Sequence, residues 1–199
     1  MLGVAVLALG VSAAAAVDPR LIQAVKNRDV DAVRALLKQR VDVNAPQGDG
    51  ATALHWAAQR DDLTIVDLLI RAGARANVAD DLGTTPLHLA CTNRSGSMVE
   101  RLLSADANAN AALSSGETAL MTCARAGDAR AVKALLAHGA DVSAKEHEHQ
   151  QTALMWAAAQ RHPDVVQLLV EARADVRARS LSYAQTVVGE RRSGRDAKS

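Results

Sequence analysis

The sequence predicts an all-α solenoid of about five helix-turn-helix repeats joined by short β-hairpin-like loops. Two observations carry this prediction: a phrase that recurs at a nearly constant interval, and a composition poor in aromatic residues. Apolar residues make up 49% of the chain, yet aromatic residues make up only 2% and Phe is absent. A globular core usually relies on aromatic side chains for bulk. Ala, Leu and Val instead suit thin, repeated contacts between helices.

The recurring phrase is centred on a threonine followed two residues later by a leucine. Its threonines are Thr52, Thr85, Thr118 and Thr152, which gives steps of 33, 33 and 34 residues. A second phrase of Val and paired Leu residues follows each copy at a fixed offset, as in Ile65-Val66-Asp67-Leu68-Leu69. One step before Thr52, the same apolar register runs from Pro19 to residue 45 without the threonine. The chain therefore contains four signature-bearing units and one degenerate leading unit.

The period of 33 and the phrase Thr85-Pro86-Leu87-His88 are those of the ankyrin repeat. The chain resembles ankyrin-repeat proteins over residues 17–179, and its apolar N-terminus resembles that of exported bacterial members. The repeat units lie near 17–48, 49–81, 82–114, 115–148 and 149–179. The resemblance implies stacked helical hairpins with a concave groove. It also implies a structural role for His55 and His88, which would tie the loop of one repeat to the next.

Helix ends are marked in the same register. The four threonines are expected to be N-caps, because a hydroxyl can accept from an otherwise unpaired helix N–H. Gly73 and Gly139 occupy the position where a left-handed C-cap is expected. The matching residues Arg40, Asp106 and Arg173 are therefore predicted to adopt positive φ, which is unfavourable for residues with a side chain.

The two ends of the chain depart from the repeat. Residues 1–16 carry no charge and combine an apolar run with a small-residue site of the A-x-A kind, which predicts a signal peptide, although a basic n-region is missing. The alternative is an apolar helix packed on the end of the stack. Export to the periplasm or cell exterior is the prediction, and a cytoplasmic location is the alternative. Residues 180–199 are predicted to be a flexible basic tail or a truncated inter-repeat insertion.

The two cysteines, Cys91 and Cys123, both fall inside predicted helices where a small apolar residue is expected. Unpaired cysteine serves that purpose. We therefore expect two free, buried thiols. A disulfide between them in an oxidising compartment is the less favoured alternative, because the sequence does not give the distance between their Cα atoms.

Motifs for chemistry are missing from the sequence. There is no G-x-S-x-G, Walker, G-x-G-x-x-G or H-E-x-x-H phrase. His147 and His149, with His138 and His162 nearby, do not make the set of about four ligands that a metal site requires, and an exposed turn explains them. We expect no enzyme activity, cofactor, metal or small-molecule substrate. Nucleic-acid binding is not expected either, because aromatic residues for base stacking are scarce.

A partner protein is the expected ligand, bound by a monomer with no transmembrane segment in the mature chain. Positions on the loops and first helices that face the groove change from unit to unit while the framework does not. The alternatives are a fragment of a larger protein whose active domain lies beyond Ser199, and an inhibitor or accessory factor for an exported enzyme. The candidate groove residues are Asp49, Trp56, Gln59, Arg60, Asp81, Leu82, Thr84, Thr92, Asn93, Ser115, Glu117, Arg125, His149, Gln151, Trp156 and Gln160.

Overall fold

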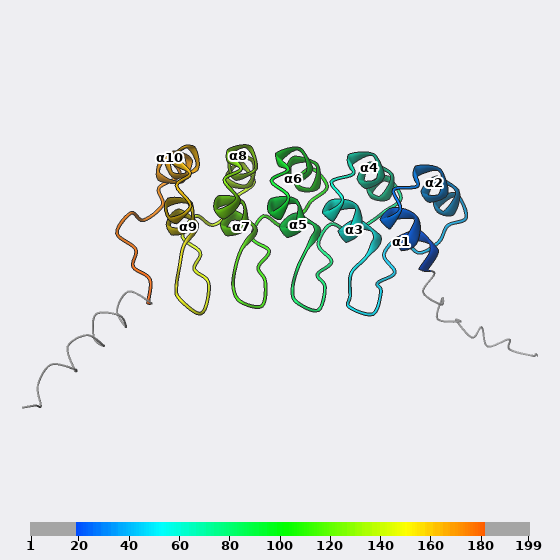
Figure 1. The fold of residues 1–199 in the computed structure, drawn as a ribbon, viewed down its shortest axis with the longest axis horizontal. Coiled ribbons are helices and arrows are strands. Elements are labelled where there is room, and N and C mark those ends of the chain that lie inside the picture. Colours follow the sequence, from blue (N-terminus) through cyan, green and yellow to red (C-terminus); the bar gives the residue numbers. More distant parts are fainter. Residues whose placement is uncertain (1–18, 182–199) are drawn as a thin grey trace, which may run out of the picture.

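The computed structural model describes residues 19–181, and the predicted signal peptide (1–16) and residues 182–199 lie outside this range. Within it the chain forms five helical hairpins in a row (Figure 1), which confirms the all-α solenoid. None of these helices is long and apolar enough to cross a membrane. The helices are α1 (Pro19–Lys26), α2 (Val30–Lys38), α3 (Ala53–Gln59), α4 (Leu63–Arg71), α5 (Pro86–Thr92), α6 (Gly96–Leu103), α7 (Ala119–Ala126), α8 (Ala129–Ala137), α9 (Ala153–Ala159) and α10 (Pro163–Glu171).

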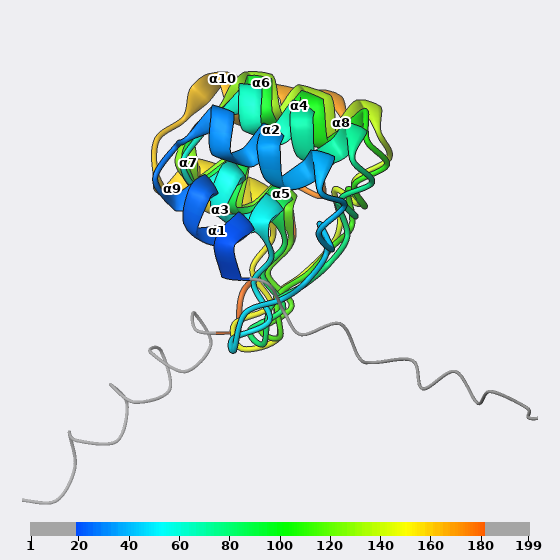
Figure 2. The ribbon, with the colours of Figure 1, turned by 90° about the vertical axis from the view of Figure 1, so that its right-hand side faces the viewer.

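The hairpins stack in two layers, with the first helix of each pair next to the long loops and the second helix in the other layer (Figures 1 and 2). One leucine of each first helix lies between neighbouring repeats. Leu21, Leu54, Leu87 and Leu120 are at most 2% exposed. The fifth equivalent, Leu154, is only half-buried, because no described hairpin follows the last one, whereas Leu21 of the first hairpin is covered by the hairpin that follows it. Burial at this position therefore depends on stacking.

All four threonines stand at the N-cap position, but only two of their hydroxyls accept from a helix N–H as predicted. The hydroxyls of Thr52 and Thr85 instead contact Nδ1 of His55 and His88 at 2.9 Å. The Thr118 hydroxyl accepts from the Met121 N–H at 3.3 Å, and that of Thr152 from the Met155 N–H at 3.4 Å. Arg40, Asp106 and Arg173 have φ of 58°, 60° and 65°, as the register predicted.

The long loops, which we call fingers, comprise residues 46–52, 79–85, 112–118 and 145–152. Each is closed by a backbone hydrogen bond across its base, such as that from Asp80 N–H to the Thr84 carbonyl at 2.9 Å. Neighbouring fingers are also joined to one another. The donor and acceptor pairs are Asp81 to Asp49, Ser114 to Leu82, His147 to Ser115, and Leu181 to His149. The first residues of the predicted tail therefore still follow the finger register.

A second set of hydrogen bonds between neighbouring repeats was not predicted from the sequence. Asn44, Asn77 and Asn110 follow the second helices of the first three hairpins, and each side chain bridges to the end of the next hairpin. The Asn77 amide donates to the Asp106 carbonyl at 2.7 Å and accepts from the Asn108 N–H at 2.6 Å. Asn44 and Asn110 make the same two contacts one repeat earlier and one later. The sequence pattern that could have predicted these hydrogen bonds is an asparagine repeated every 33 residues. Ser143 replaces this asparagine between the fourth and fifth hairpins.

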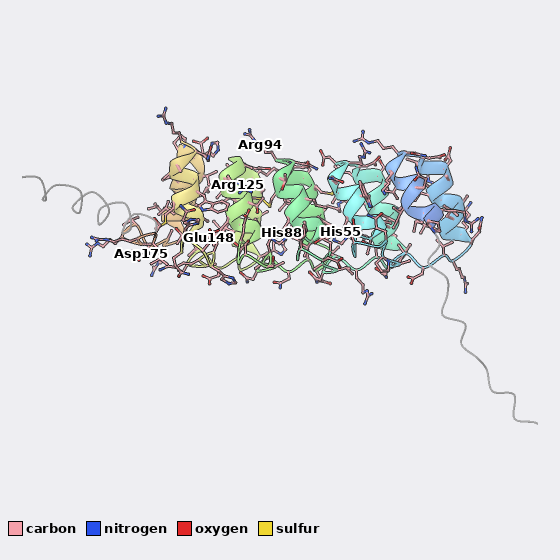
Figure 3. The ribbon with its side chains drawn as sticks, turned by 60° about the horizontal axis from the view of Figure 1, so that its bottom comes forward. His55, His88, Arg94, Arg125, Glu148 and Asp175 are labelled. Atoms are coloured by element: carbon pink, nitrogen blue, oxygen red, sulfur yellow. A yellow bond between two sulfur atoms is a disulfide. The ribbon has the colours of Figure 1, made fainter. Side chains whose placement is uncertain are left out.

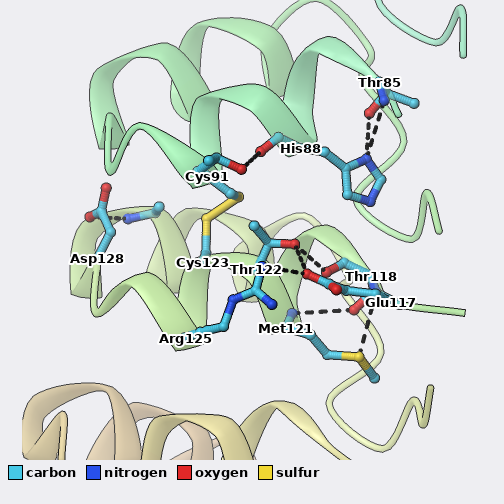
Figure 4. Close-up of a disulfide and its surroundings, with 12 residues drawn as sticks. Thr85, His88, Cys91, Glu117, Thr118, Met121, Thr122, Cys123, Arg125 and Asp128 are labelled. Carbon is cyan, nitrogen blue, oxygen red and sulfur yellow. Dashed lines mark hydrogen bonds and ion pairs between the residues drawn. A yellow bond between two sulfur atoms is a disulfide. The ribbon is translucent and has the colours of Figure 1, made fainter. Parts of the chain in front are cut away.

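The expectation of two free thiols is wrong: Cys91 of α5 and Cys123 of α7 form a disulfide (Figure 4). Their Cα atoms are 4.6 Å apart, within the usual range for a disulfide. Both residues are fully buried between the third and fourth hairpins. The repeat alignment did not predict this disulfide, because the residue equivalent to Cys91 in the next repeat is at position 124 and not Cys123. The two helices are placed so that residues one position out of register face each other.

His55 and His88 are almost fully buried at the start of α3 and α5. The Nδ1 atom of His55 accepts from the Thr52 N–H at 3.1 Å, so Nε2 carries the proton and donates to the Thr84 carbonyl at 3.0 Å. His55 thus ties its helix to the second finger. His88 makes the same Nδ1 contacts with Thr85, but its Nε2 atom finds no hydrogen-bond partner among the described residues. Burial lowers the pKa of both imidazoles.

Stability is expected to fall in mildly acidic solution. Folding lowers the pKa of His55 and His88, so the unfolded chain binds protons more readily. The contribution of these neutral rings is complete above the unfolded pKa of about 6.5 and is lost as the pH falls below it. Protonation would also turn Nδ1 into a donor facing an N–H group. The measurement is the Tm between pH 7.5 and pH 5.

The control for this measurement is already present in the chain, because Met121 and Met155 occupy the equivalent positions in the later repeats. A His55→Met/His88→Met variant should lose most of the decline in Tm between these pH values. An equally steep decline in the variant would show that other groups cause it.

Candidate partner-binding face

The predicted groove residues lie on one face, formed by the first helices and the fingers, which we call the concave face. All sixteen candidates are exposed or half-buried there, and none is part of the core. Figure 3 shows the order across this face. Arg94 lies at the edge formed by the hairpin turns, Arg125 lies further in, and Glu148 lies toward the finger edge.

Four of the candidates form one cluster, which we call the Trp156 cluster. The Arg125 guanidinium lies 4.6 Å from the centroid of the Trp156 ring. The same guanidinium pairs with Glu117 at 3.0 Å, and the indole N–H of Trp156 donates to the Gln151 side chain at 2.8 Å. Glu117 also accepts from the buried Thr122 hydroxyl at 2.7 Å (Figure 4). The cluster spans the fourth and fifth hairpins and holds a half-buried aromatic ring in a fixed position.

A similar arrangement occurs at the other end of the face. Lys26 of α1 places its ammonium nitrogen 3.9 Å from the centroid of the Trp56 ring. Lys26 also donates to the Gln47 side chain at 3.2 Å, and Gln47 donates to Asp49 at 2.9 Å. Hydrogen bonds from the Ala51 N–H and from Gln47 lower the pKa of Asp49. The cation over the Trp56 ring therefore comes from the preceding hairpin.

Both clusters arise from the same pair of repeat positions. Lys26 and Arg125 occupy the same repeat position, and each covers the tryptophan of the following repeat. In the intervening repeats this position is held by Gln59 and Thr92, and neither is followed by a tryptophan. A basic residue about 30 positions before each Trp was therefore the available signal. Lys26 was not among the predicted groove residues.

Several predicted residues use their polar groups within the repeat stack. The Asn93 amide donates to the carbonyls of Ala58 and Gln59 at the end of α3, at 3.1 and 2.8 Å. The Thr84 carbonyl accepts from His55, and the Thr92 hydroxyl donates to the His88 carbonyl at 3.0 Å.

The other candidates point outward from the same face. Leu82 at the tip of the second finger is 70% exposed, which is unusual for a large apolar side chain. The His149 ring lies 3.9 Å from the Glu148 carboxylate, and the Ser115 hydroxyl accepts from the Glu117 N–H at 3.3 Å. For Gln59, Arg60, Asp81 and Gln160, the described part of the chain offers the side chains no hydrogen-bond partner.

The fourth finger is one residue longer than the others and is organised by a buried carboxylate. Glu146 accepts from the N–H groups of Glu148, His149 and Gln151 at 2.8 to 2.9 Å. Burial alone would raise the pKa of Glu146, but these backbone hydrogen bonds bring it below its ordinary value. Gln150 takes the positive φ that glycine has in the other fingers. The nearby histidines therefore belong to a structural turn, and residues 19–181 contain no group of three or more potential metal ligands.

A stack of helical hairpins with joined fingers and one variable, solvent-accessible face defines the class of repeat solenoids. The family model for ankyrin repeats (3 copies) matches residues 21–112 and again residues 95–180. This covers more than half of the chain, so the chain belongs to the ankyrin-repeat family. A search of the curated proteins gave no match. Ankyrin repeats are generally protein-interaction modules and are generally not catalytic.

Proposed function

We propose that the chain binds a partner protein through its concave face. The observation that carries this proposal is the contrast between the framework positions of the repeat and the positions that face outward. Threonine caps, buried leucines and finger closures recur from unit to unit, whereas the outward positions hold different side chains in each unit. A framework that stays constant beneath a varied, accessible surface suits recognition of one particular partner.

The mechanism is rigid presentation. The hydrogen bonds between fingers and the Asn44, Asn77 and Asn110 bridges fix neighbouring repeats before any partner arrives. A surface that is already ordered loses less conformational entropy on binding, so more of the contact energy appears as affinity. The proposed role includes no chemical step and no cofactor.

The Trp156 cluster is the proposed centre of the contact. Tryptophan and arginine are the residue types that most often dominate interface energies. Trp156 is half-buried and held by Gln151 and Arg125, so its exposed surface is pre-positioned. The Trp56 cluster at the other end of the face would be a second contact point.

A Trp156→Ala/Arg125→Ala variant tests the concave face. We expect at least a tenfold loss of partner captured from extracts of the source cells, because such residues each contribute about 2 kcal/mol or more to binding. The measured quantity is the yield of each captured protein by mass spectrometry. The matched control is Arg71→Ala/Lys133→Ala, which changes exposed residues of α4 and α8 in the other layer. If the first variant captures the same proteins at the yield of the control, the concave face is not the binding site.

We also propose that the protein is exported. The apolar segment 1–16 supports this, and so does the disulfide between Cys91 and Cys123, since disulfides persist mainly in oxidising compartments. Mass spectrometry of the protein isolated from its source cells should find a mature N-terminus near Val17 and no free thiol. A retained Met1 with two free thiols would contradict export.

A further inference from the structure

One arginine lies near the turn of every helical hairpin. These five residues, which we call the arginine row, are Arg28, Arg60, Arg94, Arg125 and Arg161. Each lies in the last turn of a first helix or just after it, and all five are exposed. First helices of neighbouring repeats pack side by side. Arg28, Arg94 and Arg161 occupy equivalent repeat positions, whereas Arg60 lies one residue and Arg125 two residues before that position. Packed helix axes are about 8–10 Å apart, so the row supplies one positive charge per repeat along the edge of the concave face.

Three arginines of the row have guanidinium groups without a partner in the described part of the chain. The guanidinium groups of Arg60, Arg94 and Arg161 form no hydrogen bond or ion pair with any residue in 19–181. Arg28 donates to the Arg60 carbonyl, and Arg125 belongs to the Trp156 cluster. A guanidinium without an internal partner presents a fork of donors suited to a carboxylate.

Acidic residues near the row are mostly engaged with the backbone. Asp29, Asp62 and Asp128 cap the second helices, and each accepts a backbone N–H bond at 2.9 to 3.0 Å. Asp29 and Asp61 are the exposed acidic residues at these turns within the described part of the chain. The flanks of Arg94 are uncharged, since Asn93 and Ser95 stand on either side.

The opposite edge of the concave face carries the other sign of charge. Asp49, Asp81 and Glu148 are exposed on the fingers. The face thus has a basic edge at the hairpin turns and an acidic edge at the fingers, as the positions of Arg94 and Glu148 in Figure 3 illustrate.

Three members of the row have a left-handed backbone conformation. Arg28, Arg94 and Arg161 have φ of 56°, 57° and 59°, while Asp61, with φ of 53°, and Gly127 fill the equivalent places in the second and fourth hairpins. Glycine is the residue that adopts this conformation without strain. A cation just after a helix C-terminus gains some energy from the helix dipole. That gain applies equally to Arg40 and Arg173, which have φ of 58° and 65° at the other set of turns and serve as matched controls.

We propose that the arginine row binds an acidic segment of the partner protein, laid along the hairpin turns. In an extended segment, residues three apart are separated by about 10 Å, which is close to the distance between packed helix axes. The proposal rests on the proposed function and narrows it to a class of partner. A protein segment is favoured over nucleic acid because aromatic residues for base stacking make up only 2% of the chain.

The test uses the full chain and a fluorescent 16-residue peptide with Glu at every third position. Binding is measured by fluorescence anisotropy at several salt concentrations, with the Tm of each variant. Arg94→Gly and Arg161→Gly should each raise the Tm by about 2 °C through relief of the left-handed strain. Each should weaken peptide binding about 2–5-fold, as expected for an exposed ion pair, and the double variant should weaken it about tenfold. Arg40→Gly and Arg173→Gly should raise the Tm similarly and leave binding unchanged.

Three outcomes would overturn the proposal: equal loss of binding in the row and control variants, equal binding of a matched Lys peptide, or tighter binding of a DNA duplex than of the Glu peptide. Capture of cellular partners by the same variants separates the two proposals. If Trp156→Ala/Arg125→Ala reduces capture and Arg94→Gly/Arg161→Gly does not, the concave face binds but the acidic-segment assignment is wrong. If neither reduces capture, both proposals fail.

Discussion

Replacing Cys91 and Cys123 together by alanine is expected to lower the free energy of unfolding by about 3–4 kcal/mol. The disulfide closes a loop with a sequence separation of 32 residues, and closing a loop of that size removes this amount of entropy from the unfolded chain. It also joins the third and fourth hairpins near the middle of the solenoid, so its loss should weaken the contact between the two halves. Guanidinium chloride unfolding measures the change.

Reduction provides the control for this prediction. The wild type unfolded and refolded in the presence of reductant should lose most of the same stability, because reduction removes the cross-link while keeping both sulfur atoms. The double alanine variant should be insensitive to reductant. An unfolding midpoint of the wild type that does not move on reduction would show that the two thiols are not joined.

Leu87→Ala is expected to destabilise the protein by about 3–5 kcal/mol, as measured by equilibrium unfolding. Leu87 is 0% exposed and lies between the second and fourth hairpins of its stack, so truncation leaves a cavity that neighbours on both sides must tolerate.

The same substitution at Leu154 gives an internal comparison. This residue occupies the same repeat position in α9 but is only half-buried. Its truncation removes less buried apolar surface, so we expect a loss of about 1–2 kcal/mol. Equal losses at the two positions would contradict the view that stacking of the following hairpin, rather than the position within the repeat, sets the contribution of each leucine to stability.

The repeat period made most of the fold predictable. Four in-phase copies of one phrase fix where each helix begins, and the register extends that information to positions with weaker local signals. Arg40, Asp106 and Arg173 illustrate this, since nothing in their immediate sequence indicates a positive φ, but their alignment with Gly73 and Gly139 does. The sixteen predicted groove residues, chosen by register, are all exposed or half-buried, and their role in binding stays a prediction.

Contacts between repeats were not predictable in the same way. The Cys91–Cys123 bond depends on how far one first helix is shifted along the next, which a one-dimensional alignment does not contain. The Lys26–Trp56 and Arg125–Trp156 contacts depend on side-chain directions across a repeat boundary. Glu146 was missed for a related reason, because its role arises only when the longer fourth finger folds around its carboxylate.

The serine at position 143 leaves one boundary between hairpins without an asparagine bridge, and we expect this boundary to be weaker than the three that have one. The asparagine bridges join the first four hairpins in succession, and the boundary between α7–α8 and α9–α10 lacks such a bridge. In an array held by nearest-neighbour contacts, unravelling then begins at the fifth hairpin. The Trp156 cluster lies across this same boundary. A partner that binds Arg125 and Trp156 together would therefore stabilise the packing of the fifth hairpin against the fourth.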